Sequence, residues 1–254
     1  IVSINGSVIL AKGNGEFAMH DIVRIGEKKL LGEVIKINKE TATIQVYENT
    51  SGLKIGETVI GEEEPLSWIL GPGIIGNVFD GIQRPLKHLQ KISGDFIEKG
   101  LDSIGIDGEK KWHFVPTVKI GDSVKLNTII GEVKETELII NKIMCNFDVE
   151  GEIIEIKAEG DYQAKDVMAK VKTLDDEIVE ITMIQKWPVR KGRPYKERLI
   201  AKELLVTGQR VVDTFFPIAK GGTAMLPGGF GTGKTMLQHQ FAKWSNADII
   251  VYIG

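Results

Sequence analysis

The chain has 254 residues, of which 42% are hydrophobic and 26% are charged, and its formal net charge is −3. This composition excludes a disordered, collagen-like or disulfide-rich chain, and no uncharged apolar run is long enough to span a membrane. The length fits one large domain or two to three small ones. The single cysteine, Cys145, cannot form an internal disulfide, so a reducing compartment is expected.

Charge is distributed unevenly along the chain. Residues 109–180 carry a net charge of −6, whereas residues 181–254 carry a net charge of +7. A basic final quarter favours an anionic ligand, such as a phosphate or a nucleic acid, or an interface with an acidic partner. Charge alone leaves both interpretations open.

The first 67 residues consist of short runs of alternating apolar and polar residues that are broken by glycine. The runs at 6–10, 31–37 and 41–47 have the length and spacing of strands, so a small β-barrel is predicted. An acidic run at 62–64 marks the end of this domain.

Residues 68–108 differ in character from the first domain. The sequence Gly-Pro-Gly at 71–73 indicates a turn, and residues 80–86 predict a second turn that leads into a short helix ending near Ile92.

Two related strings lie 39 residues apart in the next segment, at 121–133 and 160–171. Each begins with a Gly-Asp turn followed by an apolar strand, which predicts two similar halves of one flattened barrel. This quasi-repeat resembles the lipoyl and biotinyl carrier fold, in which a lysine at a hairpin tip follows an acidic pair. Leu138 stands in place of that lysine and Lys142 lacks the expected neighbours, so the resemblance implies the fold without the carrier chemistry.

Residues 181–254 change to an α/β pattern around a glycine-rich loop. The expected order is strand, loop, helix and strand. Short helical pieces are predicted at 199–205 and 209–216, buried strands at 223–226 and 247–253, and a longer helix at 235–244.

The glycine-rich loop carries the strongest functional signal, because it matches the phosphate-loop pattern G-x-x-x-x-G-K-[ST] at every fixed position. Its glycines allow successive N–H groups to point at phosphate oxygens, and the following helix adds its positive N-terminal end. Lys234 is expected to reach the β- and γ-phosphates as the catalytic cation, and the Thr235 hydroxyl to ligate Mg²⁺. The residues predicted to bind the nucleotide are Gly228, Gly229, Phe230, Gly231, Thr232, Gly233, Lys234 and Thr235.

Two other interpretations of this loop compete with phosphate binding. A glycine-rich turn with a solvated lysine is one of them. A dinucleotide-binding loop is disfavoured, because Met236 stands where its third glycine would be. Phe230 either covers the nucleotide or fills the loop.

The remaining charged and aromatic candidates are interpreted as structural. Gln83 and Arg84 are expected to fix a turn, Trp187 and Trp244 to lie in the core, and Cys145 to be a small packed residue. The four histidines lack metal-ligand spacing. A basic group either binds phosphates or, in the preferred interpretation, faces a neighbouring subunit; its members are Arg190, Lys191, Arg193, Lys196 and Arg198.

Three long motifs, at 71–86, 185–190 and 207–222, resemble the catalytic A subunits of V-type and A-type rotary ATPases. The resemblance covers the entire chain and implies a multi-domain fold of α/β and β parts. The implied parts are an N-terminal β-barrel at 1–67, the first part of a nucleotide-binding domain at 68–108, an inserted β-rich barrel-sandwich domain (the bulge) at 109–180, and a truncated P-loop (RecA-like) nucleotide-binding domain at 181–254.

The resemblance also implies a function. ATP or ADP with Mg²⁺ would bind at the loop, near a B subunit of an A3B3 hexamer, and ATP hydrolysis or synthesis would drive or use H⁺ or Na⁺ transport. Peripheral-stalk and central-stalk subunits are further implied partners, and no nucleic acid is implied. The resemblance places the protein at the cytoplasmic side of a membrane. The catalytic glutamate is implied to follow Gly254 and an arginine finger to come from the B subunit. We therefore expect an N-terminal fragment that hydrolyses ATP negligibly by itself.

Two functions of other classes fit parts of the sequence. A hexameric RNA-binding motor of the termination-factor type also places a small β-domain before a phosphate loop. Such a motor needs exposed aromatic residues for stacking, whereas residues 1–67 contain few aromatics, Phe17 and Tyr47 among them, and are net acidic. A non-enzymatic module whose acidic insertion docks a stator subunit is the second alternative.

The loop departs from the resembling family at two positions. Gly229 stands where proline is usual, and Thr232 stands where alanine or cysteine is common. Because glycine gives the loop backbone conformational freedom that is lost when nucleotide binds, we predict that Gly229→Pro raises the affinity for nucleotide, as measured by titration. Equal affinity together with an unchanged loop structure would refute the prediction.

Overall fold

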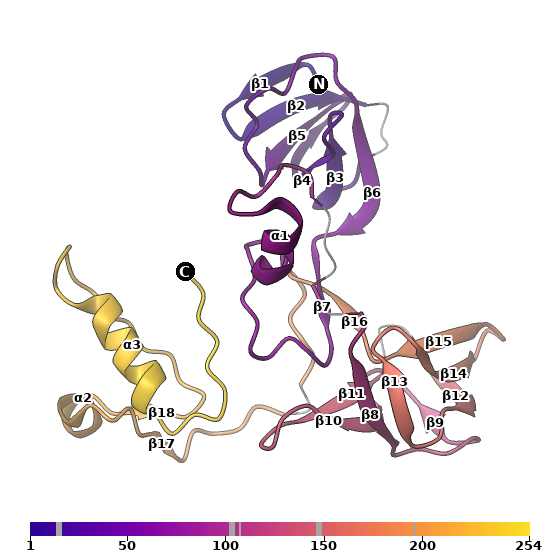
Figure 1. The fold of residues 1–254 in the computed structure, drawn as a ribbon, viewed down its shortest axis with the longest axis vertical. Coiled ribbons are helices and arrows are strands. Elements are labelled where there is room, and N and C mark those ends of the chain that lie inside the picture. Colours follow the sequence, from indigo (N-terminus) through magenta and orange to yellow (C-terminus); the bar gives the residue numbers. More distant parts are fainter. Residues whose placement is uncertain (14–16, 102–104, 107, 146–148, 196) are drawn as a thin grey trace. The chain divides into compact units, whose positions relative to one another are not determined.

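The computed structural model describes residues 1–13, 17–101, 105–106, 108–145, 149–195 and 197–254. The chain divides into two compact units, Ile1–Gly192 and Arg193–Gly254, whose elements are labelled in Figure 1. None of the helices in the described ranges is long and apolar enough to cross a membrane.

A six-stranded antiparallel sheet opens the first unit. Its strands are β1 (Ser3–Asn5), β2 (Val8–Lys12), β3 (Asp21–Ile25), β4 (Leu30–Asn38), β5 (Thr41–Val46) and β6 (Val59–Pro65), in the spatial order β1-β2-β5-β4-β3-β6. Alternate residues, such as Ile9, Val23 and Ile44, point into one buried core, as the period of two along a strand requires. The strand-rich prediction is therefore confirmed.

The edges of this sheet differ from the predicted barrel. Among the described residues β1 and β6 do not pair, so the sheet is not a closed barrel. Instead, the first residue of the chain, next to β1, is hydrogen-bonded to the segment just before β6. The N-terminal amino group of Ile1 donates to the Glu57 carbonyl at 2.7 Å, and the Gly56 N–H donates to the Ile1 carbonyl at 2.9 Å.

A pair of short strands carries the chain into and out of the insertion. β7 (Ser67–Leu70) pairs antiparallel with β16 (Gln185–Pro188), so the longer segment that contains α1 and the insertion begins and ends at neighbouring positions. α1 (Leu86–Ser93) follows the predicted turn and buries Leu89, and the residue after it, Gly94, has a φ of 70°. The prediction of a short helix here is confirmed.

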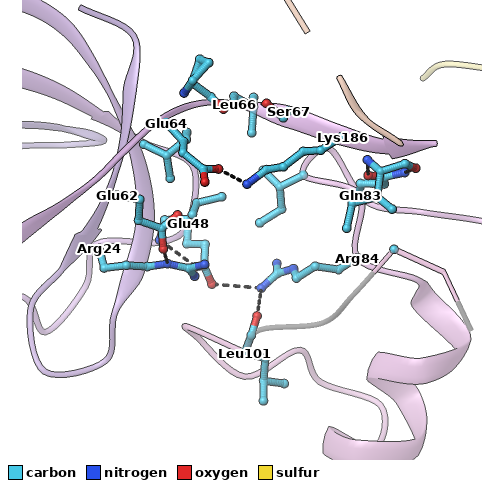
Figure 2. Close-up of a pocket in the computed structure, with 16 residues that line it drawn as sticks. Arg24, Glu48, Glu62, Glu64, Leu66, Ser67, Gln83, Arg84, Leu101 and Lys186 are labelled. Carbon is cyan, nitrogen blue, oxygen red and sulfur yellow. Dashed lines mark hydrogen bonds and ion pairs between the residues drawn. The ribbon is translucent and has the colours of Figure 1, made fainter. Parts of the chain in front are cut away.

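Ion pairs fasten the N-terminal sheet to these connecting segments. Figure 2 shows Glu48 facing Arg84 and Glu64 facing Lys186. The Glu48 and Arg84 side chains are 8% and 9% exposed, and the Glu48 Oε2 to Arg84 Nη1 distance is 3.4 Å. A buried carboxylate is costly unless a cation compensates it, so this pair fixes the segment carrying α1 against the sheet.

The insertion contains two four-stranded sheets. The first half supplies β8 (Lys111–Pro116), β9 (Ser123–Val124), β10 (Ile129–Lys134) and β11 (Ile140–Met144), and the second half supplies β12 (Gly151–Ile156), β13 (Gly160–Gln163), β14 (Val167–Thr173) and β15 (Ile178–Thr182). The sheet orders are β11-β10-β8-β13 and β15-β14-β12-β9. The two halves are therefore equivalent, as predicted, and each gives its short strand, β9 or β13, to the sheet of the other half.

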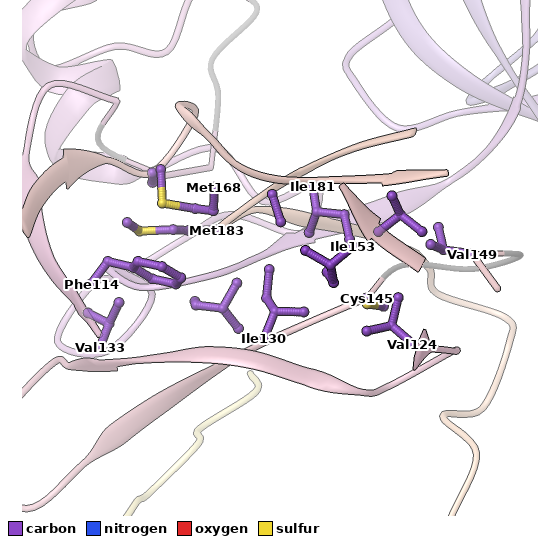
Figure 3. Close-up of a cluster of buried hydrophobic side chains, with 14 of the residues drawn as sticks. Phe114, Val124, Ile130, Val133, Cys145, Val149, Ile153, Met168, Ile181 and Met183 are labelled. Atoms are coloured by element: carbon purple, nitrogen blue, oxygen red, sulfur yellow. The ribbon is translucent and has the colours of Figure 1, made fainter. Parts of the chain in front are cut away.

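The core of the insertion lies between these two sheets (Figure 3). Phe114 and Ile130 from one sheet meet Ile153 and Met168 from the other, and each is at most 1% exposed. Cys145 belongs to the same cluster, and burial raises the pKa of its thiol to about 11. Its interpretation as a small packed residue is confirmed.

The second unit has two helices and one small sheet in its described part. Its elements are β17 (Leu204–Leu205), α2 (Arg210–Phe215), β18 (Ile218–Ala219) and α3 (Lys234–Trp244), with β17 antiparallel to β18. The predictions of helices at 209–216 and 235–244 are confirmed. The helical prediction for 199–205 is wrong, because residues 199–203 have no regular structure and β17 follows them.

Two predicted strands of the second unit are also not formed. Residues 223–226 and 247–253 have no strand assignment, and Met225 and Ile253 are exposed. A strand needs a hydrogen-bonded neighbour, and neither segment pairs with another among the described residues. Trp244 is likewise 56% exposed, so its predicted core position is wrong, whereas Trp187 is buried at 5%.

The insertion core generates a stability prediction. Phe114 is fully buried between the sheets, whereas its neighbour in β8, Val115, is 40% exposed. Truncation of a buried aromatic side chain leaves a cavity, so Phe114→Ala should lower the free energy of unfolding by about 3–5 kcal/mol. Val115→Ala is the matched control and should cost less than about 1 kcal/mol. Denaturant unfolding curves of the two variants measure the difference, and equal losses would contradict the assigned core.

Candidate functional site

The predicted phosphate loop joins an irregular segment to helix α3. Gly228, Gly231 and Gly233 have φ values of 153°, 77° and 82°, a region of backbone conformation that suits glycine. Gly233 is the residue immediately before α3. The glycines at these positions therefore allow the sharp turn that leads the backbone into the helix.

Side-chain contacts bring part of the predicted site together. The Lys234 ammonium donates to the carbonyl oxygens of Gly228 and Gly229, the latter at 3.1 Å. The Thr232 hydroxyl also donates to the Gly229 carbonyl, at 2.9 Å. Lys234 therefore lies over the loop, and Thr232 closes the loop onto itself.

The first turn of α3 has the charge expected of an anion site. It contains no acidic residue, and its N-terminal residue is Lys234. The free N–H groups of a helix start carry partial positive charge, which favours phosphate oxygens. Thr235, exposed in this first turn, carries a hydroxyl of the type that ligates Mg²⁺. Phe230 is fully exposed and does not fill the loop.

An aspartate that sequence reasoning passed over orders the segment before α2. Asp213 Oδ1 accepts hydrogen bonds from the N–H and the hydroxyl of Thr207, at 2.9 and 2.7 Å. Its Oδ2 accepts a third from the Gly208 N–H at 3.2 Å. These bonds lower the pKa of Asp213, and the bond from the Thr207 hydroxyl has the largest effect. The motif at 207–213 therefore has a structural function. The spacing of Thr207 and Asp213, six residues apart, is the feature of the sequence from which this contact could have been predicted.

Gln83 and Arg84 fix a turn, as the sequence predicted. The Gln83 amide accepts from the Ile69 N–H at 2.7 Å and donates to the Ile69 carbonyl at 2.6 Å, which extends the pairing of β7. Arg84 Nε donates to Asp80 Oδ2 at 2.7 Å, and Asp80 Oδ1 accepts from the Arg84 N–H at 2.8 Å. Both side chains are therefore engaged within the chain.

The basic group around position 190 is only partly available for an outside ligand. Arg190 binds Glu33 of β4 through two parallel hydrogen bonds of 2.8 and 2.9 Å. Sequence reasoning missed this pairing, because 157 residues separate the two. Arg198 is exposed, and Lys196 lies outside the described residues.

Glu33 is the most deeply buried carboxylate with a described ion pair, at 2% side-chain exposure. The Arg190 hydrogen bonds lower the pKa of Glu33, against the opposing effect of burial. The Tyr47 hydroxyl also donates to Glu33, and burial together with this carboxylate raises the pKa of Tyr47 to about 12. The carboxylate is thus kept ionised inside the protein.

A cavity of about 450 Å³ lies at the junction drawn in Figure 2. Its wall includes Arg24, Arg84 and Lys186, and each of these cations pairs with a carboxylate, from Glu62, Glu48 and Glu64 respectively. The wall charges therefore neutralise one another. The predicted phosphate loop, with Lys234 and no acidic residue in the first turn of α3, is therefore a better candidate for an anion site than this cavity.

Comparison with known proteins identifies the family. Models of the ATP synthase alpha/beta family match three segments: the beta-barrel domain at 1–62, the barrel-sandwich domain at 104–190 and the nucleotide-binding domain at 208–254. This chain belongs to the ATP synthase alpha/beta family. The barrel-sandwich match confirms the fold predicted for the insertion. The domain boundaries proposed from the sequence remain predictions.

Curated relatives in the ATP synthase alpha/beta family match along all 254 residues. The V-type ATP synthase alpha chain 2 of Clostridium tetani is 54% identical, the A subunit of the A-type ATP synthase of Thermococcus sibiricus 53%, and the V-type ATP synthase alpha chain of Acetivibrio thermocellus 51%. The chain spans 43% of the length of each relative. The resemblance to A subunits is thereby confirmed.

The buried Glu33 generates a pH-dependent prediction. Because its pKa is below the ordinary value of 4.5, ionised Glu33 stabilises the folded state above that pH, and the gain is lost as the pH falls through the lowered pKa. Glu33→Gln should therefore cost about 1–3 kcal/mol at pH 7, and the deficit should shrink in acid.

Chemical denaturation at a series of pH values measures this deficit. Glu64→Gln, at the half-exposed pair with Lys186, is the control and should cost at most about 1 kcal/mol at pH 7. A Glu33→Gln deficit that is independent of pH would contradict the assignment.

Proposed function

We propose that this chain contains the phosphate-binding loop of the catalytic A subunit of a V/A-type ATP synthase, a rotary ATPase. The observation that carries the proposal is the glycine loop leading into α3, with Lys234 lying over it. Family membership and relatives named as ATP synthase A subunits support the same conclusion.

Each residue of the loop has a proposed task. The backbone N–H groups from Gly228 to Gly233 and the N-terminal end of α3 hold the β- and γ-phosphates of ATP or ADP. Lys234 exchanges its loop carbonyls for phosphate oxygens and neutralises charge that builds up during phosphoryl transfer. The Thr235 hydroxyl holds Mg²⁺, which when bound supplies further neutralisation of the phosphate oxygens.

The proposed partners follow from the same assignment. B subunits would complete an A3B3 hexamer, and peripheral-stalk and central-stalk subunits would connect it to a membrane sector that moves H⁺ or Na⁺. The protein would act at the cytoplasmic side of that membrane. Its acidic insertion would be one docking surface for the stator, as the charge of residues 109–180 suggests.

The alternative of an RNA-binding motor gains no support from the first sheet. Such a motor needs aromatic side chains that are free to stack on bases. Tyr47 is 39% exposed, and its hydroxyl donates to Glu33. Phe17 packs against the buried core of the sheet. The aromatic residues of this sheet therefore serve the fold.

Removal of the loop cation tests the proposal. Lys234→Ala should weaken binding of a fluorescent ATP analogue about 10–100-fold, the loss expected for charged hydrogen bonds to phosphate. Lys220→Ala is the control, because Lys220 is an exposed lysine of the same unit that pairs with Glu203 at 3.1 Å. The wild-type affinity should also fall when EDTA replaces Mg²⁺. Unchanged affinity in Lys234→Ala would overturn the proposal.

A further inference from the structure

Residues 206–208 are held on one side by helix α2. Asp213 of α2 accepts hydrogen bonds from the N–H and the hydroxyl of Thr207 at 2.9 and 2.7 Å, and from the N–H of Gly208 at 3.2 Å. Thr207 is fully buried, and its hydroxyl also accepts a hydrogen bond from the Gln209 N–H at 3.2 Å. A buried hydroxyl with both a donor and an acceptor as partners has a fixed orientation. Asp213 therefore sets the conformation of this segment.

The residues at the end of α3 hold the same segment on its other side. The side-chain Oδ1 of Asn246 accepts a hydrogen bond from the Val206 N–H at 3.1 Å, and the Asn246 N–H donates to the Val206 carbonyl at 3.1 Å. Asn246 lies two positions after Trp244, the last residue of α3. The segment is therefore bonded to the C-terminal end of α3 through both backbone polar groups of Val206.

Gly208 brings the backbone of the segment directly against α3. Its φ is 75°, and a Cβ placed on it would lie 2.6 Å from the Trp244 Cβ and 3.1 Å from the Trp244 carbonyl oxygen. Non-bonded carbon atoms are most stable about 3.5–4.0 Å apart, so a side chain here would push the end of the helix away. Glycine at this position therefore sets the distance between the segment and α3.

Helix α3 connects these contacts to the phosphate loop. It runs from Lys234, which directly follows Gly233 of the loop, to Trp244 and contains 11 residues, a length of about 16 Å. A helix of this length is stiff, because each turn is hydrogen-bonded to the next. A displacement of its C-terminal end is therefore transmitted to Lys234 and to the loop glycines at its N-terminal end.

We propose that Asp213 and Gly208 are positioning residues for the phosphate loop. They hold the C-terminal end of α3 through residues 206–208, and α3 holds Lys234 and its own N-terminal N–H groups where phosphate would bind. Both residues act through the helix and not by contact with a ligand. Their effect on affinity rests on the proposed binding of ATP, whereas their effect on the shape of the empty loop does not.

The shape of the loop is tested without nucleotide, by NMR of the amide resonances of Gly231 and Gly233. Thr207→Val keeps the shape of the side chain but removes the hydroxyl that is bonded to Asp213, so these resonances should shift. Thr207→Ser keeps the hydroxyl and removes a methyl group, so they should stay close to their wild-type positions. Equal shifts in the two variants would overturn the proposal, because packing alone would then explain them.

Gly208→Ala tests the close approach to α3. The added Cβ overlaps Trp244, so this variant should shift the resonances of Gly231 and Gly233 further than Thr207→Val does. Gly221→Ala is the matched control, because Gly221 also has a positive φ, 79°, yet a Cβ there would meet nothing within 4 Å. Equal shifts of the loop resonances in the two glycine variants would contradict the role of Gly208.

The affinity for nucleotide is a second readout. Asp213→Asn removes the charge and one acceptor oxygen, and should weaken binding of a fluorescent ATP analogue with Mg²⁺ about 3–30-fold, the range expected for coupling between distant residues. Glu203→Gln makes the same change to an exposed carboxylate of this unit, which pairs with Lys220, and should leave the affinity unchanged. Hydrogen exchange at the Leu237 amide, which is bonded to the Gly233 carbonyl, verifies that α3 is folded in each variant.

The two readouts separate this inference from the proposed function. If the wild-type chain did not bind the analogue, the proposed function would fail, whereas shifts at Gly231 and Gly233 in Thr207→Val would still support the positioning of the loop. If the wild-type chain binds the analogue, but Thr207→Val and Asp213→Asn with folded α3 change neither the resonances nor the affinity, the inference is overturned and the proposed function stands.

Discussion

Every strand in this protein needs a neighbour to satisfy its backbone N–H and carbonyl groups, and this requirement organises the first unit. β7 and β16 pair with each other, so the chain can leave β7, pass through α1 and the insertion, and return to the same place at β16. Within the insertion, β9 and β13 find partners in the opposite half. In the N-terminal sheet, hydrogen bonds from Ile1 and Gly56 occupy the gap between edge strands that do not pair among the described residues.

The same requirement separates what could be predicted from what could not. The glycine-rich turn at 228–233 and α3 are local structures, whose glycine conformations and helical hydrogen bonds need no distant partner, so the sequence pattern was sufficient to predict the turn and the helix. Phosphate binding by this turn remains a prediction. The equivalence of the insertion halves was visible because the chain repeats itself. Residues 223–226 and 247–253 have the composition of buried strands, but composition cannot supply the neighbours that a strand needs.

Ion pairs between residues far apart in the chain were the other feature that could not be predicted from the sequence. Arg190 belongs to a basic run, and nothing local indicates that its partner is Glu33 in the middle of an apolar strand. Glu48 and Arg84 present the same difficulty. In each case the pairing follows from burial, because a carboxylate removed from water requires a cation nearby. Such pairs become predictable only when the fold that buries them is known.

The exchange of β9 and β13 makes the two halves of the insertion inseparable. Each four-stranded sheet takes three strands from one half and one from the other, so neither half can complete its sheet without its counterpart. Loss of either half would remove one strand from the sheet of the remaining half and expose the shared core around Phe114 and Ile153 to solvent. In evolution, an interlocked insertion of this kind can be acquired or discarded only as a whole, which makes it a stable platform on which surface residues are free to diverge.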